Sequence, residues 1–155
     1  MAGLVNRLLL DRLRRAGAVE RVLRERLSEP LHMNVISAFV ALFGSLRWKI
    51  AFDLVFRQYT AFCLYEAATR ARAQGLSEIK ALEFGVASGA GLLNMCKIAE
   101  RVKKATGVTV TVHGFDTASG LPPVRDYRDH PELYAEGDYV MPSSDDLIAK
   151  LPPFA

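Results

Sequence analysis

The sequence predicts a mixed α/β fold, in which helices come first and a parallel strand–helix–strand unit follows. Three observations carry this prediction. An apolar segment at 79–86 precedes a turn of small residues, a helical pattern then runs to Gly107, and Val108, Val110 and Val112 alternate with polar residues. Strict alternation indicates a strand, and two strands joined by a helix form a βαβ unit whose strands run parallel.

Length and composition fit one globular domain. Half of the 155 residues are hydrophobic and 24% are charged, which excludes a disordered or low-complexity chain. Two Cys cannot form a disulfide framework, and with three scattered His they do not indicate a structural zinc site. The net charge of +3 is too small to indicate a nucleic-acid partner.

The first part of the chain predicts two helices. Residues 3–28 indicate an amphipathic helix with an Arg-rich face, which we interpret as solvated rather than membrane-bound. A mostly apolar helix is expected over 31–43, ending at Gly44, and it is shorter than the ~20 residues that span a membrane. Because no segment resembles a targeting signal either, the sequence predicts a cytoplasmic protein without a membrane partner.

A third helix is expected over 46–74, with apolar residues on one face and Gly75 in a left-handed conformation just beyond its end. The pattern divides the chain into an N-terminal helical extension, 1–45, and an α/β domain, 46–155.

After Asp116 the sequence is irregular and rich in proline, until Ser143 begins a pattern typical of a helix N-terminus. Two strands do not make a sheet covered on both faces, and a doubly wound domain uses about six. We therefore expect the chain to be the front portion of a larger domain, inactive alone and prone to associate through exposed apolar surface. Homo-oligomerisation is left open.

Residues suited to ligand binding follow the end of each predicted strand. Gly85, Ala87, Gly89 and Gly91 occupy every second position after the first strand, so backbone N–H groups are free to approach a ligand. Asp116 follows the second strand. In a βαβ nucleotide site, an acid at that position accepts hydrogen bonds from ribose hydroxyls. Together these residues indicate a nucleotide-type cofactor.

Two residues favour S-adenosyl-L-methionine over a dinucleotide. The dinucleotide pattern G-x-G-x-x-G ends on a small residue, and Asn94 stands at that place. Glu83 enters the turn, where its carboxylate suits the α-amino group of S-adenosylmethionine better than a pyrophosphate. A nicotinamide-dependent oxidoreductase remains the alternative.

The segments EFGVASG (83–89) and GFDTASGLP (114–122) resemble the motifs of class I S-adenosylmethionine-dependent methyltransferases, and within them the macrocin O-methyltransferase-like group. The resemblance spans roughly residues 46–142. It implies a Rossmann-like methyltransferase fold, truncated here after the second strand and preceded by a helical cap. It also implies the cofactor-binding residues: Glu83 at the methionine end, Gly85, Ala87, Ser88 and Gly89 along the cofactor, Asp116 on the ribose and Thr117 near adenine.

The activity implied by the resemblance is methyl transfer to an oxygen of a small-molecule or sugar acceptor. The family's catalytic base and magnesium-binding acids follow its third and fourth strands, which are not expected within this sequence. No catalytic residue and no metal ligand is therefore assigned, and Mg2+ dependence is left open. The alternative from another class is a non-catalytic fragment that binds cofactor only.

Other polar residues have structural interpretations. His113 is expected to pack in its strand and His130 to be solvated, while Cys63 and Cys96 are expected to be buried thiols. The remaining acids after residue 120 match no calcium-loop pattern and are expected to be solvated. They include Asp126, Asp129, Asp138, Asp145 and Asp146.

Overall fold

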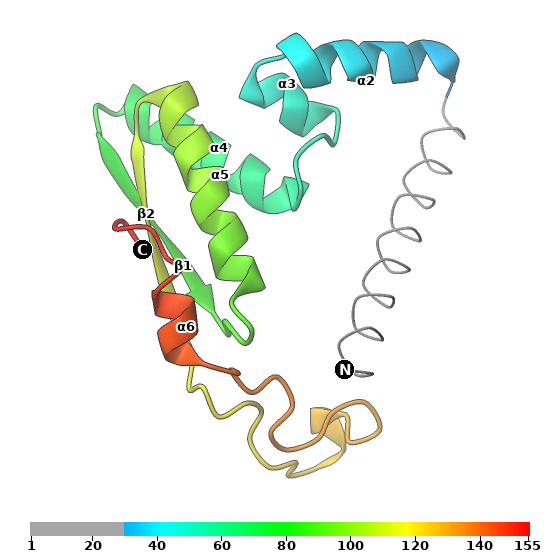
Figure 1. Cartoon of the computed structure of the whole chain (residues 1–155), viewed down its shortest axis with the longest axis vertical. Coiled ribbons are helices and arrows are strands. Elements are labelled where there is room, and N and C mark those ends of the chain that lie inside the picture. The colour runs from blue at the N-terminus through cyan, green and yellow to red at the C-terminus, as the bar shows by residue number, and fades with distance from the viewer. Residues whose placement is uncertain (1–29) are drawn as a thin grey trace, which may run out of the picture. The chain divides into compact units, whose positions relative to one another are not determined.

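The fold comes from a computed structural model that describes residues 30–155 (Figure 1). The chain divides into two compact units, Met1–Gly44 and Ser45–Ala155. The helix expected over 3–28 lies outside the described residues. The second unit has a mixed α/β fold, with a two-stranded parallel sheet and helices.

Helix α2 spans Leu31–Phe43 in the first unit. It starts after Pro30, a residue that suits a helix start because its missing N–H would have no intrahelical partner there. It ends at Gly44, whose N–H donates to the Val40 carbonyl at 2.8 Å. Both bounds confirm the prediction. Within residues 30–155, no helix combines the length and the apolar character that crossing a membrane requires.

The prediction of one helix over 46–74 is wrong. The structure has two helices there, α3 over Leu46–Ala51 and α4 over Gln58–Ala73. Between them Asp53 and Arg57 adopt left-handed backbone conformations, with φ of 51° and 58°. Residues with side chains rarely adopt this conformation, and it cannot continue a right-handed helix.

Burial explains the break between α3 and α4. Ile50 and Val55 are both only 4% exposed, yet residues five positions apart lie on different faces of a continuous helix. The break lets both side chains enter one core. Gln58 stabilises it, because its side-chain amide donates to the Ile50 carbonyl at 2.7 Å. Beyond α4, Gly75 has the predicted left-handed conformation, with φ of 78°.

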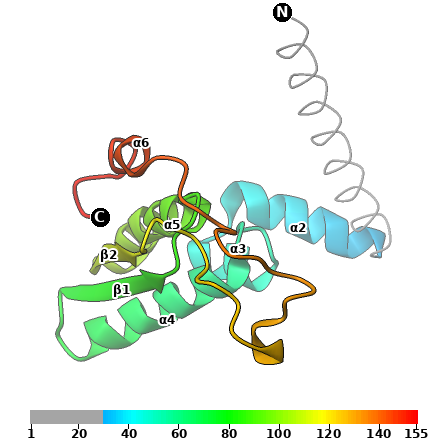
Figure 2. The same ribbon diagram turned by 90° about the horizontal axis from the view of Figure 1, so that it is seen from below.

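The parallel βαβ unit predicted from the sequence is confirmed (Figure 2). It consists of β1 over Glu78–Phe84, α5 over Ala90–Thr106 and β2 over Thr109–Phe115. The strands pair in parallel, with Ala81 opposite Val112. The predicted first strand runs two residues too far at its end, because those residues belong to the turn before α5.

The two faces of the sheet differ in exposure. α4 and α5 contact the strands, and Ala81 and Val110 are buried on the face they cover. On the opposite face Leu82, Phe84 and Phe115 are exposed, Phe84 by 75%. The rings of Phe84 and Phe115 stack there with their centroids 5.1 Å apart.

Aliphatic side chains fill the centre of the core. The largest fully buried side chains are those of Ile98, Val102, Val108, Val110 and Val112. They come from α5, from β2 and from the short link between them, so the βαβ unit supplies the centre of its own core.

The C-terminal residues pack against the βαβ unit. α6 spans Ser144–Ile148, and Ser143 accepts a hydrogen bond from the Asp146 N–H at 3.1 Å, as the predicted helix start requires. Leu147 is buried in the core. Further on, the Phe154 carbonyl accepts from the Val112 N–H at 3.1 Å. These residues therefore lie beside β2 as well as α5.

Candidate functional site

The turn between β1 and α5 has an unusual backbone. Gly85, Ala87 and Gly89 all have positive φ, of 83°, 49° and 82°. The Gly85 N–H donates to the Phe115 carbonyl at 2.9 Å, which fastens the turn to the end of β2. Ala87 has a side chain, so its left-handed conformation costs free energy that its surroundings must offset.

Asp116 supplies part of that compensation, because its carboxylate joins the turns that follow the two strands. One oxygen, Oδ2, accepts hydrogen bonds from the N–H groups of Val86 at 2.6 Å and Ala87 at 2.8 Å. The other, Oδ1, accepts from the Ala118 N–H at 2.6 Å. These bonds lower the pKa of Asp116 below its usual value, and the bond from Ala87 contributes most to that lowering. A carboxylate accepts about four hydrogen bonds, so about one position remains for a ligand.

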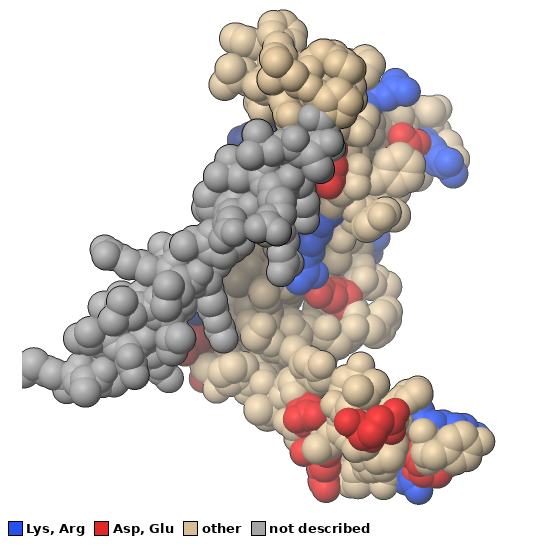
Figure 3. Space-filling view, turned by 90° about the vertical axis from the view of Figure 1, so that its right-hand side faces the viewer, with Lys and Arg blue, Asp and Glu red and all other residues tan. Residues whose placement is uncertain are grey.

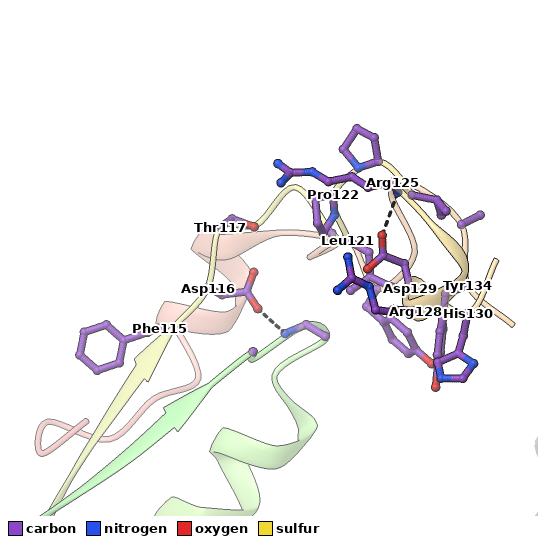
Figure 4. A pocket seen from close by; sticks show the side chains of 17 residues that line it. Phe115, Asp116, Thr117, Leu121, Pro122, Arg125, Arg128, Asp129, His130 and Tyr134 are labelled. Carbon is purple, nitrogen blue, oxygen red and sulfur yellow. Dashed lines mark hydrogen bonds between the residues drawn. The ribbon is translucent and has the colours of Figure 1, made fainter.

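A cavity of about 1060 Å³ opens where β1 and β2 end (Figure 4). Four of the residues predicted to bind cofactor line it: Gly85, Ala87, Asp116 and Thr117. The other three, Glu83, Ser88 and Gly89, are outside its lining. The carboxyl ends of parallel strands are the usual ligand position in open α/β sheets.

The 117–142 loop forms the far wall of the cavity. Hydrogen bonds between backbone groups of the loop close it on itself. The Leu121 N–H donates to the Asp138 carbonyl at 2.8 Å, and the Gly137 N–H donates to the Leu121 carbonyl at 3.0 Å. The Met141 N–H donates to the Ala118 carbonyl at 3.3 Å. The two ends of the loop are therefore held together by hydrogen bonds of the chain itself.

Three of the acids predicted to be solvated also hold the structure of this loop through hydrogen bonds or an ion pair. Asp129 Oδ2 accepts from the Arg125 N–H at 2.8 Å, and Asp138 Oδ2 accepts from the Ala135 N–H at 2.7 Å. Asp126 pairs with the guanidinium of Arg128 at 2.6 Å. Short-range side-chain bonds of this kind form turns, and periodicity does not reveal them.

The loop presents both charge signs and aromatic rings to the cavity. The lining residues that it contributes include Leu121, Arg125, Arg128, His130, Tyr134 and Tyr139. In Figure 4 the guanidinium groups of Arg125 and Arg128 extend toward the side of Asp116 and Thr117. On the face drawn in Figure 3, acidic side chains gather at the lower end, where this loop lies. His130 Nδ1 lies 3.0 Å from Glu132 Oε1, so His130 is paired as well as solvated.

Glu83 lies away from the cavity lining, at the first turn of α5. A Cβ added at Gly91 would collide with Glu83 Oε1, so the carboxylate sits directly over that glycine. Its Oε2 atom is buried and has no hydrogen-bond partner among residues 30–155. Burial raises the pKa of Glu83, and the positive charge of Arg57 partly opposes that rise. The helical pattern does not indicate a role for Arg57, because it places this residue inside a continuous helix.

The two cysteines differ in exposure. Cys96 is buried, as predicted, but Cys63 is exposed, because the face of α4 that carries it does not contact the sheet core. Within residues 30–155 no group of three or more His, Cys, Asp or Glu side chains is arranged to hold a metal ion. The expectation about Mg2+ therefore stays a prediction.

Comparisons with protein-family models, curated proteins and solved structures found no match to the chain.

Proposed function

We propose that the chain binds S-adenosyl-L-methionine and forms the cofactor-binding part of a Rossmann-like, class I methyltransferase. One observation carries the proposal: Asp116 ties together the turns after β1 and β2 at the rim of a cavity. That position is where a nucleoside binds in an open α/β sheet. The motif resemblance then selects the cofactor.

The cavity offers a nucleoside three kinds of contact. Gly85 and Ala87 leave backbone exposed at the turn, which suits close approach by a sugar. Asp116 keeps about one acceptor position for a ribose hydroxyl. Phe115 and the apolar part of the loop provide surface for a planar base, with Thr117 beside them.

The choice of S-adenosylmethionine over a dinucleotide depends on two residues near α5. Asn94 replaces the small residue that lets a dinucleotide-binding helix pack closely against its strand. Glu83 places a carboxylate over the first turn of α5, where it would repel a pyrophosphate. A dinucleotide is therefore the less favoured ligand.

The reaction would be transfer of a methyl group to an acceptor oxygen, and the bound cofactor supplies that methyl group from its sulfonium. The protein's own contribution is to hold donor and acceptor in line, which lowers the entropic part of the barrier. The 117–142 loop faces the cofactor position and would contact the acceptor. No described residue is assigned as the base.

The test is ligand binding by the whole chain, measured by calorimetry. S-adenosylhomocysteine, the demethylated product, should bind, and NADH should not. Asp116→Ala should weaken S-adenosylhomocysteine binding by about tenfold or more, since hydrogen bonds to charged groups are strong and the turn geometry is lost as well. Asp116→Asn should also weaken binding. The side-chain NH2 group of Asn would face a backbone N–H whose hydrogen bond the carboxylate now accepts.

The matched control is Asp145→Ala, which removes an exposed acid from the first turn of α6, outside the lining of the cavity. Its affinity for S-adenosylhomocysteine should stay within about twofold of the parent, because rim changes away from a ligand contribute little. Tight binding of NADH without binding of S-adenosylhomocysteine would favour the oxidoreductase alternative.

A further inference from the structure

The 117–142 loop distributes its charged side chains unevenly. It contains two Arg and five acids, so its net charge is negative. Both Arg125 and Arg128 line the cavity, whereas four of the acids lie outside the lining: Asp126, Glu132, Glu136 and Asp138. The fifth acid, Asp129, lines the cavity, but it accepts hydrogen bonds from the backbone N–H groups of Arg125 at 2.8 Å and Asp126 at 3.4 Å. An acidic loop therefore presents both of its guanidinium groups to the cavity.

The guanidinium of Arg125 is available to a ligand. Its backbone N–H donates to Asp129, but among residues 30–155 its side chain makes no hydrogen bond and has no acid within 4.0 Å. In Figure 4 this guanidinium extends toward the side of Asp116 and Thr117. A guanidinium carries five N–H donors in a planar fork that matches the two oxygens of a carboxylate. The full donor capacity of Arg125 thus remains for a ligand in the cavity.

Arg128 is held in place by Asp126. Its Nε and Nη2 atoms donate to the Asp126 carboxylate, at 3.0 Å and 2.6 Å for the shorter bonds, and its backbone N–H donates to the same carboxylate at 2.9 Å. Nη1 takes no part in these bonds, so its two N–H groups remain available within the described part of the chain. The pair orients the guanidinium and offsets part of its charge. We therefore expect Arg125 to be the main donor and Arg128 the second.

Aromatic and apolar surface lies beside the two Arg. Tyr134 and Tyr139 line the cavity with their ring centroids 6.3 Å apart, and Leu121 and Pro122 add aliphatic surface. Tyr139 has a φ of 63°, in the left-handed region. Residues with side chains rarely adopt this conformation, and such strain is frequent at binding sites. A ring that carries a negative charge fits this combination of apolar surface and guanidinium groups.

We propose that the methyl acceptor is a hydroxylated ring compound that carries a carboxylate, and that Arg125 and Arg128 bind this carboxylate. The inference rests on the proposed function and deepens it, since it names the class of acceptor. The ring hydroxyl would be the acceptor oxygen. A single negative charge suits the cavity better than the larger charge of a phosphate, because the carboxylates of Asp116 and Asp129 line the same cavity and repel an anion.

The experiment compares two phenols that differ in charge. Para-hydroxybenzoate carries a carboxylate, and para-hydroxybenzamide carries a neutral amide of similar shape. Each is titrated into the nitrogen-labelled whole chain in the presence of saturating S-adenosylhomocysteine, and NMR follows the amide and the arginine Nε–H resonances. The parent should bind the benzoate at least about tenfold more tightly, because hydrogen bonds to charged groups are the stronger ones. The Nε–H resonance of Arg125 should shift with the benzoate and not with the benzamide.

Substitution of either Arg tests its role in binding the carboxylate. Arg125→Gln should weaken benzoate binding by about tenfold and leave the benzamide and S-adenosylhomocysteine within about twofold of the parent. Its fold should be retained, because the backbone of Arg125 and not its side chain bonds to Asp129. Arg128→Gln should show the same selective loss. Arg125→Lys keeps the charge without the planar fork and should retain part of the affinity.

Two controls accompany these variants. Arg70→Gln makes the same change at an exposed arginine in the last turn of α4, outside the cavity lining, and should bind every ligand as the parent does. Inorganic phosphate should displace para-hydroxybenzoate less readily than benzoate does, because it has no ring and can carry two charges. Displacement by phosphate at a lower concentration than by benzoate would overturn the assignment to a carboxylate.

The outcomes distinguish this inference from the proposed function. If the parent binds S-adenosylhomocysteine but does not distinguish the two phenols, the proposed function stands and the inference is wrong. If either Gln variant keeps the parent's affinity for para-hydroxybenzoate, or loses S-adenosylhomocysteine to the same extent, the inference is also wrong. If the parent binds para-hydroxybenzoate selectively without binding S-adenosylhomocysteine, the carboxylate site stands and the proposed function fails, and the acceptor role fails with it.

Discussion

Helix α5, β2 and the link between them contain five fully buried aliphatic side chains, whereas no residue of the 117–142 loop is buried. The first region is held by removal of apolar surface from water, which has no preferred direction. The loop is held by backbone and carboxylate hydrogen bonds, which depend on exact placement of a few groups. The cavity lies between the end of the βαβ unit and the loop, and hydrogen bonds hold both of its walls: those of Asp116 on the side of the turn, and those of the backbone within the loop.

The comparison predicts very different responses to loss of an apolar side chain. Ile98→Ala removes a side chain that is 2% exposed, so it should lower the free energy of unfolding by about 2–5 kcal/mol. Leu133→Ala in the loop removes one that is 66% exposed, so the change should stay within about 0.5 kcal/mol. Urea denaturation followed by circular dichroism measures both. Equal losses would show that the loop is part of the cooperative core.

The same difference decides what the sequence could predict. The valines of β2 alternate with polar residues, and the apolar positions of α5 recur at helical spacing, so both elements and their parallel pairing followed from pattern alone. The mistaken continuous helix over 46–74 marks the limit of that method. Helical spacing persists through the break, and only the shared burial of Ile50 and Val55 reveals it.

The site was predictable to the extent that it depends on backbone freedom and strand ends. The sequence predicts Gly85, Ala87 and Asp116 at a ligand site, because small residues follow the first strand and an acid follows the second. The structure has all three in the lining of the cavity. The loop wall was not predictable, since its shape depends on pairs such as Leu121 with Asp138, which no periodicity encodes. Arg57 was missed for a different reason: its position near Glu83 depends on a helix break that tertiary packing imposes.

Two glycines of the loop sharpen the comparison, because they share a backbone conformation and differ in surroundings. Gly120 and Gly137 have φ of 80° and 79°. A Cβ at Gly120 would lie 2.7 Å from the carbonyl oxygens of Gly137 and Asp138, whereas a Cβ at Gly137 would meet nothing within 4 Å. Alanine at either position has to adopt a left-handed backbone conformation, which costs free energy. Only Gly120→Ala also forces apart the backbone segments that close the base of the loop.

Hydrogen exchange of the Leu121 amide, which donates across that base, reports the effect. Its protection against exchange should fall about tenfold further in Gly120→Ala than in Gly137→Ala. A factor of ten corresponds to a difference of about 1.4 kcal/mol in the free energy of local opening. Amides in the centre of α5 should keep their protection in both variants, because the βαβ core does not depend on the loop. A similar loss in α5 would mean that the two regions unfold as one.

The smallest expected effect concerns Asp116, the carboxylate that connects the two regions. Backbone hydrogen bonds from Ala87, Ala118 and Val86, in that order, lower its pKa below the ordinary 3.8. The fold therefore favours the charged form, and the stability that this carboxylate contributes is complete above about pH 4. It is lost as the pH falls through the lowered pKa, where protonation removes the charge that strengthens these bonds. The side chain is exposed, so solvent screening keeps the effect small.

The measurement is the difference in unfolding free energy between the parent and Asp116→Ala, followed from about pH 6 down to about pH 2. The parent should be the more stable protein at the upper end of this pH range, and the two unfolding free energies should converge as the pH falls.

Two other carboxylates of the loop also have lowered pKa values, Asp126 through Arg128 and Glu132 through His130. Both remain in the parent and in Asp116→Ala, so their contributions to the difference cancel. An Asp126→Ala comparison should converge in the same way, because its carboxylate also has a lowered pKa. A difference for Asp116→Ala that stays constant down to the lowest pH would mean that the neutral carboxyl holds the two turns as well as the charged one does, and that charge plays no part in joining them.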